Sequence, residues 1–161
     1  MYFTHDYFAN TSDKNNFIQA TARIAKKQGV QRLVAVSPIE HELYWSEDKH
    51  TPIEVRDNAQ MAALQNFDKM TILNSNLVFG RDSYLVHYLT QCAMSGKIAK
   101  SIGGSKKFQY KPVSTEDLTT AILTAFEKTN EVKGKRFSVN GNSSITLNEL
   151  LHLAEKFVGK E

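Results

Sequence analysis

The chain has 161 residues, of which 41% are hydrophobic and 23% are charged, a composition typical of one soluble globular domain. No apolar run approaches the ~20 residues that a membrane-spanning helix needs, and nothing near Met1 resembles a secretory signal. The net charge of +3 arises from basic and acidic residues interspersed along the sequence, so it indicates no particular partner. The single cysteine, Cys92, excludes an internal disulfide, and we expect it to be a small buried side chain.

The first expected elements are a helix and a buried strand. The helix begins at Ser12 or Asp13 as N-cap and ends before Gly29, a residue that commonly terminates helices. The run from Arg32 to Val36 is almost continuously apolar, which is typical of a strand buried on both faces of a parallel sheet.

The middle of the chain continues with helix, strand and helix. Thr51, Pro52 and Glu54 form a capping box with proline at the first helical position, which predicts a helix that runs to about Asn66. A strand over residues 70–73 follows, and then a helix over residues 82–95.

The last third adds two further strand and helix units. A strand over residues 107–110 precedes a helix that Ser114 caps, and a strand over residues 136–139 precedes a helix with a second capping box, Thr146 to Glu149. Strands that alternate with helices of this length predict the α/β class, with parallel strands joined by right-handed crossovers.

Four segments of the sequence resemble motifs of the extended and atypical short-chain dehydrogenase/reductase (SDR) family, in the order and at the spacing of that family. They are residues 26–37 (KKQGVQRLVAVS), 71–81 (TILNSNLVFGR), 111–118 (KPVSTEDL) and 134–150 (GKRFSVNGNSSITLNEL). The resemblance implies a partial Rossmann-type parallel sheet flanked by helices.

The family's dinucleotide fingerprint, G-x-x-G-x-x-G, has no counterpart in this sequence. The only glycine pair, Gly103-Gly104, is followed by no helix pattern. The resemblance therefore implies that the chain lacks the N-terminal βαβαβ half, which holds most of the cofactor. We expect NADP(H) or NAD(H) to be held mainly by that missing or partner half, and neither to be bound by this chain alone.

The catalytic Tyr-x-x-x-Lys of the family is also replaced. An alignment on Arg56 places Glu54 at the tyrosine and Asn58 at the lysine, and an asparagine carries no charge that could lower a neighbouring pKa. We therefore expect no catalytic residues and no enzyme activity. A rival pair, Tyr44 and Lys49, has a spacing of five and precedes the helix, so it is expected in an exposed loop.

Polar residues follow two of the expected buried strands. Ser37 ends the first strand, and Asn74, Ser75 and Asn76 end the second; ligands of open α/β sheets bind at such carboxyl ends. These four residues are the candidate contacts with a nicotinamide or ribose, although turn and backbone roles would also explain them. The five histidines lack metal-ligand spacing, so no metal site is expected.

The missing half has a consequence for the sheet. Without its neighbour, the strand over residues 32–36 would form an open apolar edge, which favours aggregation. We therefore expect that the chain is not a free monomer: a partner chain carries the missing half, the chain is trimmed from a longer one, or another protein has replaced that half. The chain itself is expected to be a single partial domain over residues 1–161. Residues 1–12, which carry four aromatic side chains, are expected to be a docking segment or a tail.

Within the family, Val78 to Asp82 is most similar to the SDR-like accessory subunits of mitochondrial respiratory complex I (the alpha subcomplex subunit 9 group). This resemblance implies a non-catalytic accessory subunit that completes a split nucleotide-binding domain, peripheral to the matrix side of the mitochondrial inner membrane and bound to other respiratory subunits. It implies no nucleic-acid partner. The alternatives are half of a two-chain NAD(P)-dependent epimerase or reductase, and an NmrA-like nucleotide sensor.

Overall fold

The computed structural model of the chain describes residues 2–3, 11–38, 52–81, 83–95 and 109–159. Two compact units share these residues. Unit 1 comprises Met1–Asn74 with Thr120–Ser138, and unit 2 comprises Ser75–Thr119 with Val139–Glu161. Each unit is treated by itself below.

Unit 1 is built on a four-stranded sheet. Its strands are β1 (Tyr2–Phe3), β2 (Leu33–Pro38), β3 (Met70–Ser75) and β7 (Arg136–Val139), in the spatial order β1-β2-β3-β7. β1 pairs with β2 in parallel. Backbone hydrogen bonds between β3 and β7 advance in the same direction along both strands, which is the parallel pattern. The expected α/β class and parallel sheet are confirmed.

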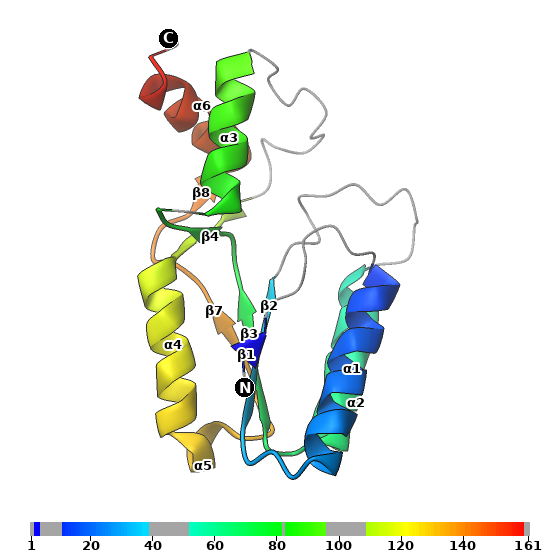
Figure 1. Cartoon of the computed structure of the whole chain (residues 1–161). Coiled ribbons are helices and arrows are strands. Elements are labelled where there is room, and N and C mark those ends of the chain that lie inside the picture. Colours follow the sequence, from blue (N-terminus) through cyan, green and yellow to red (C-terminus); the bar gives the residue numbers. More distant parts are fainter. Residues whose placement is uncertain (1, 4–10, 39–51, 82, 96–108, 160–161) are drawn as a thin grey trace. The chain divides into compact units, whose positions relative to one another are not determined.

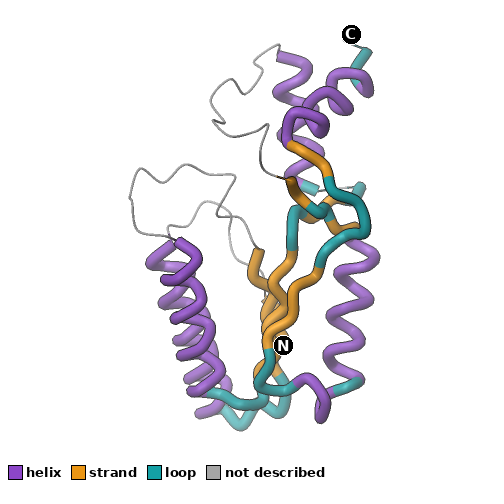
Figure 2. The backbone as a smooth tube through the Cα atoms, turned by 180° about the vertical axis from the view of Figure 1, so that it is seen from behind, coloured by secondary structure: helices purple, strands orange, loops and turns teal. Residues whose placement is uncertain are grey.

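Helices cover both faces of this sheet (Figures 1 and 2). α1 (Thr11–Lys27) and α2 (Pro52–Asn66) lie side by side on one face, and α4 (Thr115–Glu127) covers the other face and leads into the short α5 (Thr129–Val132). Gly29 follows α1 with a φ of +65°, which explains why the helix ends there. None of the described helices is long and apolar enough to cross a bilayer.

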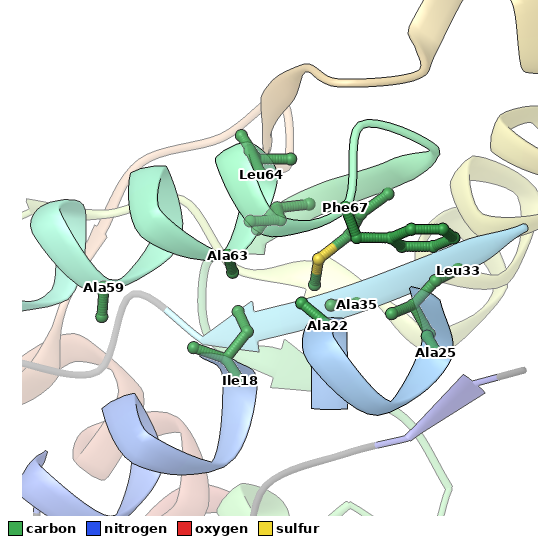
Figure 3. Packing of buried hydrophobic residues seen from close by; sticks show 11 residues of the cluster. Ile18, Ala22, Ala25, Leu33, Ala35, Ala59, Ala63, Leu64 and Phe67 are labelled. Carbon is green, nitrogen blue, oxygen red and sulfur yellow. The ribbon is translucent and has the colours of Figure 1, made fainter. Parts of the chain in front are cut away.

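The core of unit 1 lies between the α1–α2 layer and the sheet (Figure 3). Small side chains line the seam between the two helices, so the helices approach closely. Larger side chains fill the space above the strands, where burial of each contributes about 1.5–3 kcal/mol. The seam is formed by Ala22, Ala25, Ala59 and Ala63, and the larger members include Ile18, Leu33, Leu64, Phe67, Met70 and Ile72.

The expectation that β2 would be an open edge is wrong. Tyr2 pairs with Val34 and Phe3 pairs with Ala35, so β1 covers part of β2 and is itself the edge strand. Residues 2–3 thereby have a defined place in the sheet, and the role of residues 1–12 as a docking segment or a tail stays a prediction. The role of the remaining residues of this segment, 1 and 4–10, falls outside the described residues.

The described residues of unit 2 form two short strand pairs and include the two helices α3 and α6. β4 (Val78–Phe79) pairs in parallel with β6 (Val113–Ser114), whereas β5 (Gln109–Tyr110) pairs antiparallel with β8 (Ile145–Thr146). The strand expected over residues 107–110 therefore belongs to a separate antiparallel pair.

α3 (Tyr84–Ser95) and α6 (Leu147–Phe157) pack against each other in unit 2. Both caps that the sequence predicts in this unit are present: the Ser114 Oγ accepts a hydrogen bond from the Asp117 N–H, and Thr146 and Glu149 form the full capping box. Cys92 is half-buried on α3.

Candidate functional site

Ser37 and Asn74 stand at the carboxyl ends of β2 and β3, and their side chains are 9% and 8% exposed. Side chains alternate between the two faces of a strand. Leu33 and Ala35 on β2, like Met70 and Ile72 on β3, belong to the core beneath α1 and α2. Ser37 and Asn74 continue these alternations, so both side chains point toward the same helix layer.

The Asn74 amide is bound by a second amide from α2. The Gln60 Nε2 donates to the Asn74 Oδ1 at 2.8 Å, and the Asn74 Nδ2 donates back to the Gln60 Oε1 at 3.3 Å. Gln60 is only 1% exposed. Each buried amide thus satisfies the other, which avoids the cost of desolvating unpaired polar groups. The pair fixes the end of β3 to α2.

A charged pair extends this contact to β7. The Arg136 Nη1 donates to the Asp57 Oδ1 at 3.0 Å and to the Gln60 Oε1 at 3.4 Å. Asp57 and Gln60 are one turn apart on α2, so a single helix face supplies both acceptors. We call Asp57, Gln60, Asn74 and Arg136 the polar network. It joins α2 to the carboxyl end of β3 and to the first residue of β7.

The sequence predicted Asn74 but not the rest of the polar network. Gln60 lies in the run from Ala59 to Leu64, whose other five residues are apolar. A glutamine on the buried face of such a helix needs a buried partner. That was the available signal, but the sequence did not say which residue supplies the partner.

Ser75 and Asn76 are placed differently from Ser37 and Asn74. Ser75 alternates with Asn74 and so points to the opposite face of β3; it is 1% exposed, and its Oγ has no hydrogen-bond partner among the described residues. The Asn76 Oδ1 accepts from the Leu77 N–H at 2.9 Å, and its Nδ2 donates to the Asn140 Oδ1 at 3.3 Å. The Asn76 amide therefore shapes a turn of unit 2.

The four candidate residues thus have different capacities to hold a nicotinamide or ribose. The amides of Asn74 and Asn76 are already engaged by protein groups. The Ser75 Oγ is an orphaned buried polar atom, the kind of group that a ligand or water satisfies. Ser37 stands at the strand end where ligands of parallel sheets bind. The two serine hydroxyls therefore fit a cofactor or substrate better than the two amides.

The positions aligned with the family's catalytic pair both lie on α2. Asn58 is exposed, and Glu54 lies in the first turn of the helix. The rival pair, Tyr44 and Lys49, falls outside the described residues, as does Thr51 of the predicted capping box. Among the residues that are described, no three histidine, cysteine, aspartate or glutamate side chains gather as metal ligands.

Comparison with known proteins gives matches to solved structures only. No protein-family profile matches the chain, and no curated protein matches it. It is similar to dTDP-glucose 4,6-dehydratase from Bacillus anthracis in complex with NAD, with 16% identity, a TM-score of 0.65, and coverage of 96% of this chain and 56% of that chain. The chain has part of an SDR-like Rossmann fold.

Two epimerases show the same likeness. UDP-N-acetylglucosamine 4-epimerase from Bacillus cereus has 14% identity and a TM-score of 0.64, with 98% of this chain and 61% of that chain covered. UDP-glucuronic acid 4-epimerase from the same organism, in complex with UDP-glucuronic acid and NAD, has 14% identity, a TM-score of 0.66, and coverage of 99% and 55%. The chain thus spans little more than half the length of these structures.

These neighbours contradict the expectation that the chain is not an enzyme. They are NAD-dependent dehydratases and epimerases, so the fold that this chain shares is one that carries catalysis. The replacement of two positions by Glu54 and Asn58 was an insufficient reason, because active sites of open α/β sheets draw on several loops at the carboxyl edge. The neighbours give no support to a place in complex I.

Proposed function

We propose that this chain supplies the substrate-side half of an NAD(P)-dependent epimerase or dehydratase that acts on nucleoside-diphosphate sugars. The observation that carries the proposal is the match of 96–99% of this chain to enzymes of that class, of whose length it spans 55–61%. The remaining half, which holds the dinucleotide, comes from a partner chain or from another part of a longer chain.

In this proposal the residues of unit 1 have separate tasks. The Ser37 hydroxyl, at the end of β2, donates a hydrogen bond to the sugar or to the cofactor's ribose. The polar network holds the end of β3 in place through the Gln60–Asn74 amide pair. NAD(P), when bound, would supply the hydride chemistry at the sugar. Tyr44 or Glu54 serves as the acid/base in place of the family's tyrosine.

The first experiment is affinity capture of the full chain from its native cells, followed by an activity assay of the assembly. The captured assembly is incubated with NAD and, in turn, UDP-glucose, UDP-N-acetylglucosamine, UDP-glucuronic acid and dTDP-glucose, and the sugars are analysed by NMR. Formation of a 4-epimer or of a 4-keto-6-deoxy sugar supports the proposal. An assembly that binds NAD tightly but leaves all four sugars unchanged contradicts it.

The Ser37→Ala variant tests the site within that assembly. Loss of one hydrogen bond to the reacting sugar lowers kcat/KM by about tenfold or more. The matched control is Thr119→Ala, which also removes one hydroxyl; the Thr119 Oγ1 donates only to the Thr115 carbonyl oxygen of its own helix, at 2.7 Å. Equal activity of the two variants would show that the Ser37 hydroxyl makes no hydrogen bond to the reacting sugar.

The same capture tests the partner and the location. A chain with a G-x-x-G-x-x-G sequence should co-purify if the missing half is separate. Recovery of respiratory-chain subunits would support the predicted place at the mitochondrial inner membrane. Their absence from an active two-chain particle would contradict that location.

A further inference from the structure

Basic side chains gather at the amino-terminal edge of the sheet in unit 1. Three turns lead into β2, β3 and β7 at this edge, over residues 26–32, 67–69 and 127–135 (Figure 1). We call the charged residues of these turns the amino-edge patch. Its basic members are Lys26, Lys27, Arg32, Lys69, Lys128, Lys133 and Lys135, and its acidic members are Asp68, Glu127 and Glu131.

Hydrogen bonds join the three turns to one another. The Lys69 Nζ donates to the Gln31 Oε1 at 3.3 Å, which links the first turn to the second. The Gly134 N–H donates to the Met70 carbonyl oxygen at 2.7 Å, which links the second to the third. The patch is therefore one surface of unit 1, although its members are up to a hundred or so positions apart in sequence.

The amino-edge patch carries the excess positive charge of the protein. Seven basic and three acidic side chains give it a formal net charge of +4, whereas the whole chain carries +3. The rest of the chain therefore has a net charge of −1. Lysines near helix C-termini do favour the helix dipole, and that role covers Lys26 and Lys27 of α1, Lys128 after α4 and Lys133 at the C-cap of α5. It does not explain Lys69 and Lys135.

The chemistry of the patch indicates the kind of partner. All six lysines are exposed, and an ammonium group is a point charge without a preferred contact geometry. The one guanidinium, Arg32, is half-buried and donates to the Ala125 carbonyl oxygen of α4. Recognition of nucleic acids or of defined carboxylates favours the planar fork of arginine and exposed aromatic rings. Lysines alone suit a surface of spread negative charge.

We propose that the amino-edge patch docks this protein on an anionic phospholipid surface. The patch and the candidate site stand at opposite ends of the same strands, which are six residues or about 20 Å long. Docking through the amino edge leaves Ser37 and Asn74, at the carboxyl ends of β2 and β3, facing away from the lipid. A substrate in solution keeps its access to the carboxyl edge.

The test is co-sedimentation of the full chain with phosphatidylcholine vesicles, with and without phosphatidylserine. The triple variant Lys69→Gln, Lys133→Gln and Lys135→Gln should bind the mixed vesicles at least ~tenfold more weakly, because each lysine near an anionic surface contributes about fivefold to binding. The matched control neutralises three exposed basic residues of unit 2: Arg81, Lys111 and Lys156, each changed to Gln. It should retain most of the binding.

Two further measurements keep the proposal falsifiable. The same three patch lysines changed to Arg keep the charge and should bind like the unmodified chain, which separates loss of charge from loss of fold. Binding should also weaken as salt rises, because exposed charges are screened beyond about 10 Å at 0.1 M salt. Equal losses in patch and control variants, equal binding to phosphatidylcholine alone, or stronger binding to duplex DNA in competition would each overturn the proposal.

Discussion

At the scale of single residues, the Gln60–Asn74 pair shows how a buried polar group can hold a strand end in position. Both residues are buried in unit 1, Gln60 with 1% and Asn74 with 8% exposure. Their two mutual hydrogen bonds satisfy them, and Arg136 adds a third contact to Gln60. Removal of one partner leaves the other buried and unsatisfied, which costs more than the hydrogen bond itself contributes.

The Gln60→Ala variant should therefore destabilise the protein by about 2–3 kcal/mol, measured by urea unfolding. Gln65→Ala, an exposed glutamine on the same helix, is the control and should change stability by less than about 0.5 kcal/mol. Similar losses for the two variants would mean that the amide pair adds no stability.

Gly141 is a second position where one residue decides the local structure. A Cβ at this position would lie 1.8 Å from the Pro112 carbonyl oxygen, and the Gly141 N–H donates to the Lys111 carbonyl oxygen at 3.0 Å. Only a residue without a side chain allows this approach of two backbone segments.

Gly141→Ala should lower the free energy of unfolding by about 3 kcal/mol or more, because a backbone segment has to move. Gly159→Ala is the control: the φ of Gly159 is +73°, but no atom lies within 4 Å of the added Cβ. Its cost should be about 1 kcal/mol, since only backbone strain is added. Thermal unfolding of both variants measures the difference, and equal shifts would show that the close approach is absent.

At the scale of elements, α6 has its start fixed by a capping box. The Thr146 Oγ1 accepts from the Glu149 N–H at 3.2 Å, and the Glu149 Oε2 accepts from the Thr146 N–H at 2.7 Å. The Thr146 Oγ1 also donates to the Glu149 Oε2, at 2.8 Å. The hydrogen bonds that the Glu149 carboxyl accepts, from the Thr146 backbone first and from its side chain second, lower its pKa from the usual 4.5. The ionised carboxylate is the form that caps the helix.

Because the pKa of Glu149 is lower in the folded than in the unfolded state, its ionised carboxylate stabilises the protein above about pH 4.5, the usual pKa. This contribution is lost as the pH falls from there through the lowered pKa of the folded state. Glu149→Gln should therefore remove part of the acid dependence of helicity, followed by circular dichroism between neutral pH and about pH 3. Thr146→Ala should cost about 1 kcal/mol at neutral pH. An acid profile of Glu149→Gln identical to that of the unmodified chain would contradict this role.

At the scale of the whole molecule, the arrangement of the sheet decides where charge and polarity gather. The carboxyl ends of β2 and β3 bring Ser37 and Asn74 to one edge of the sheet in unit 1, and the amino ends of the strands bring the lysines to the other. In the sequence these lysines stand among acidic residues and indicate no patch. A parallel sheet brings every turn of the same kind to the same edge, so residues from distant turns become neighbours.

The sequence by itself determined the longer helices and the strands β2, β3 and β7, with several of their ends. Caps such as Ser114 and Thr146, the stop at Gly29 and the apolar run of β2 act through contacts within a few residues, so they can be recognised locally. The order of these elements also predicted the α/β class and the parallel sheet. The residues at the strand ends followed from this, and Ser37 and Asn74 were correctly expected at one edge of the sheet.

Only the tertiary structure decided which residues meet. The Gln60–Asn74 pair, the pairing of β1 with β2 and the antiparallel pairing of β5 with β8 all depend on contacts between distant segments. A two-residue strand such as β1 has no periodicity of its own. Its pairing exists because the backbone groups of β2 need hydrogen-bond partners, which the sequence of β1 alone does not reveal.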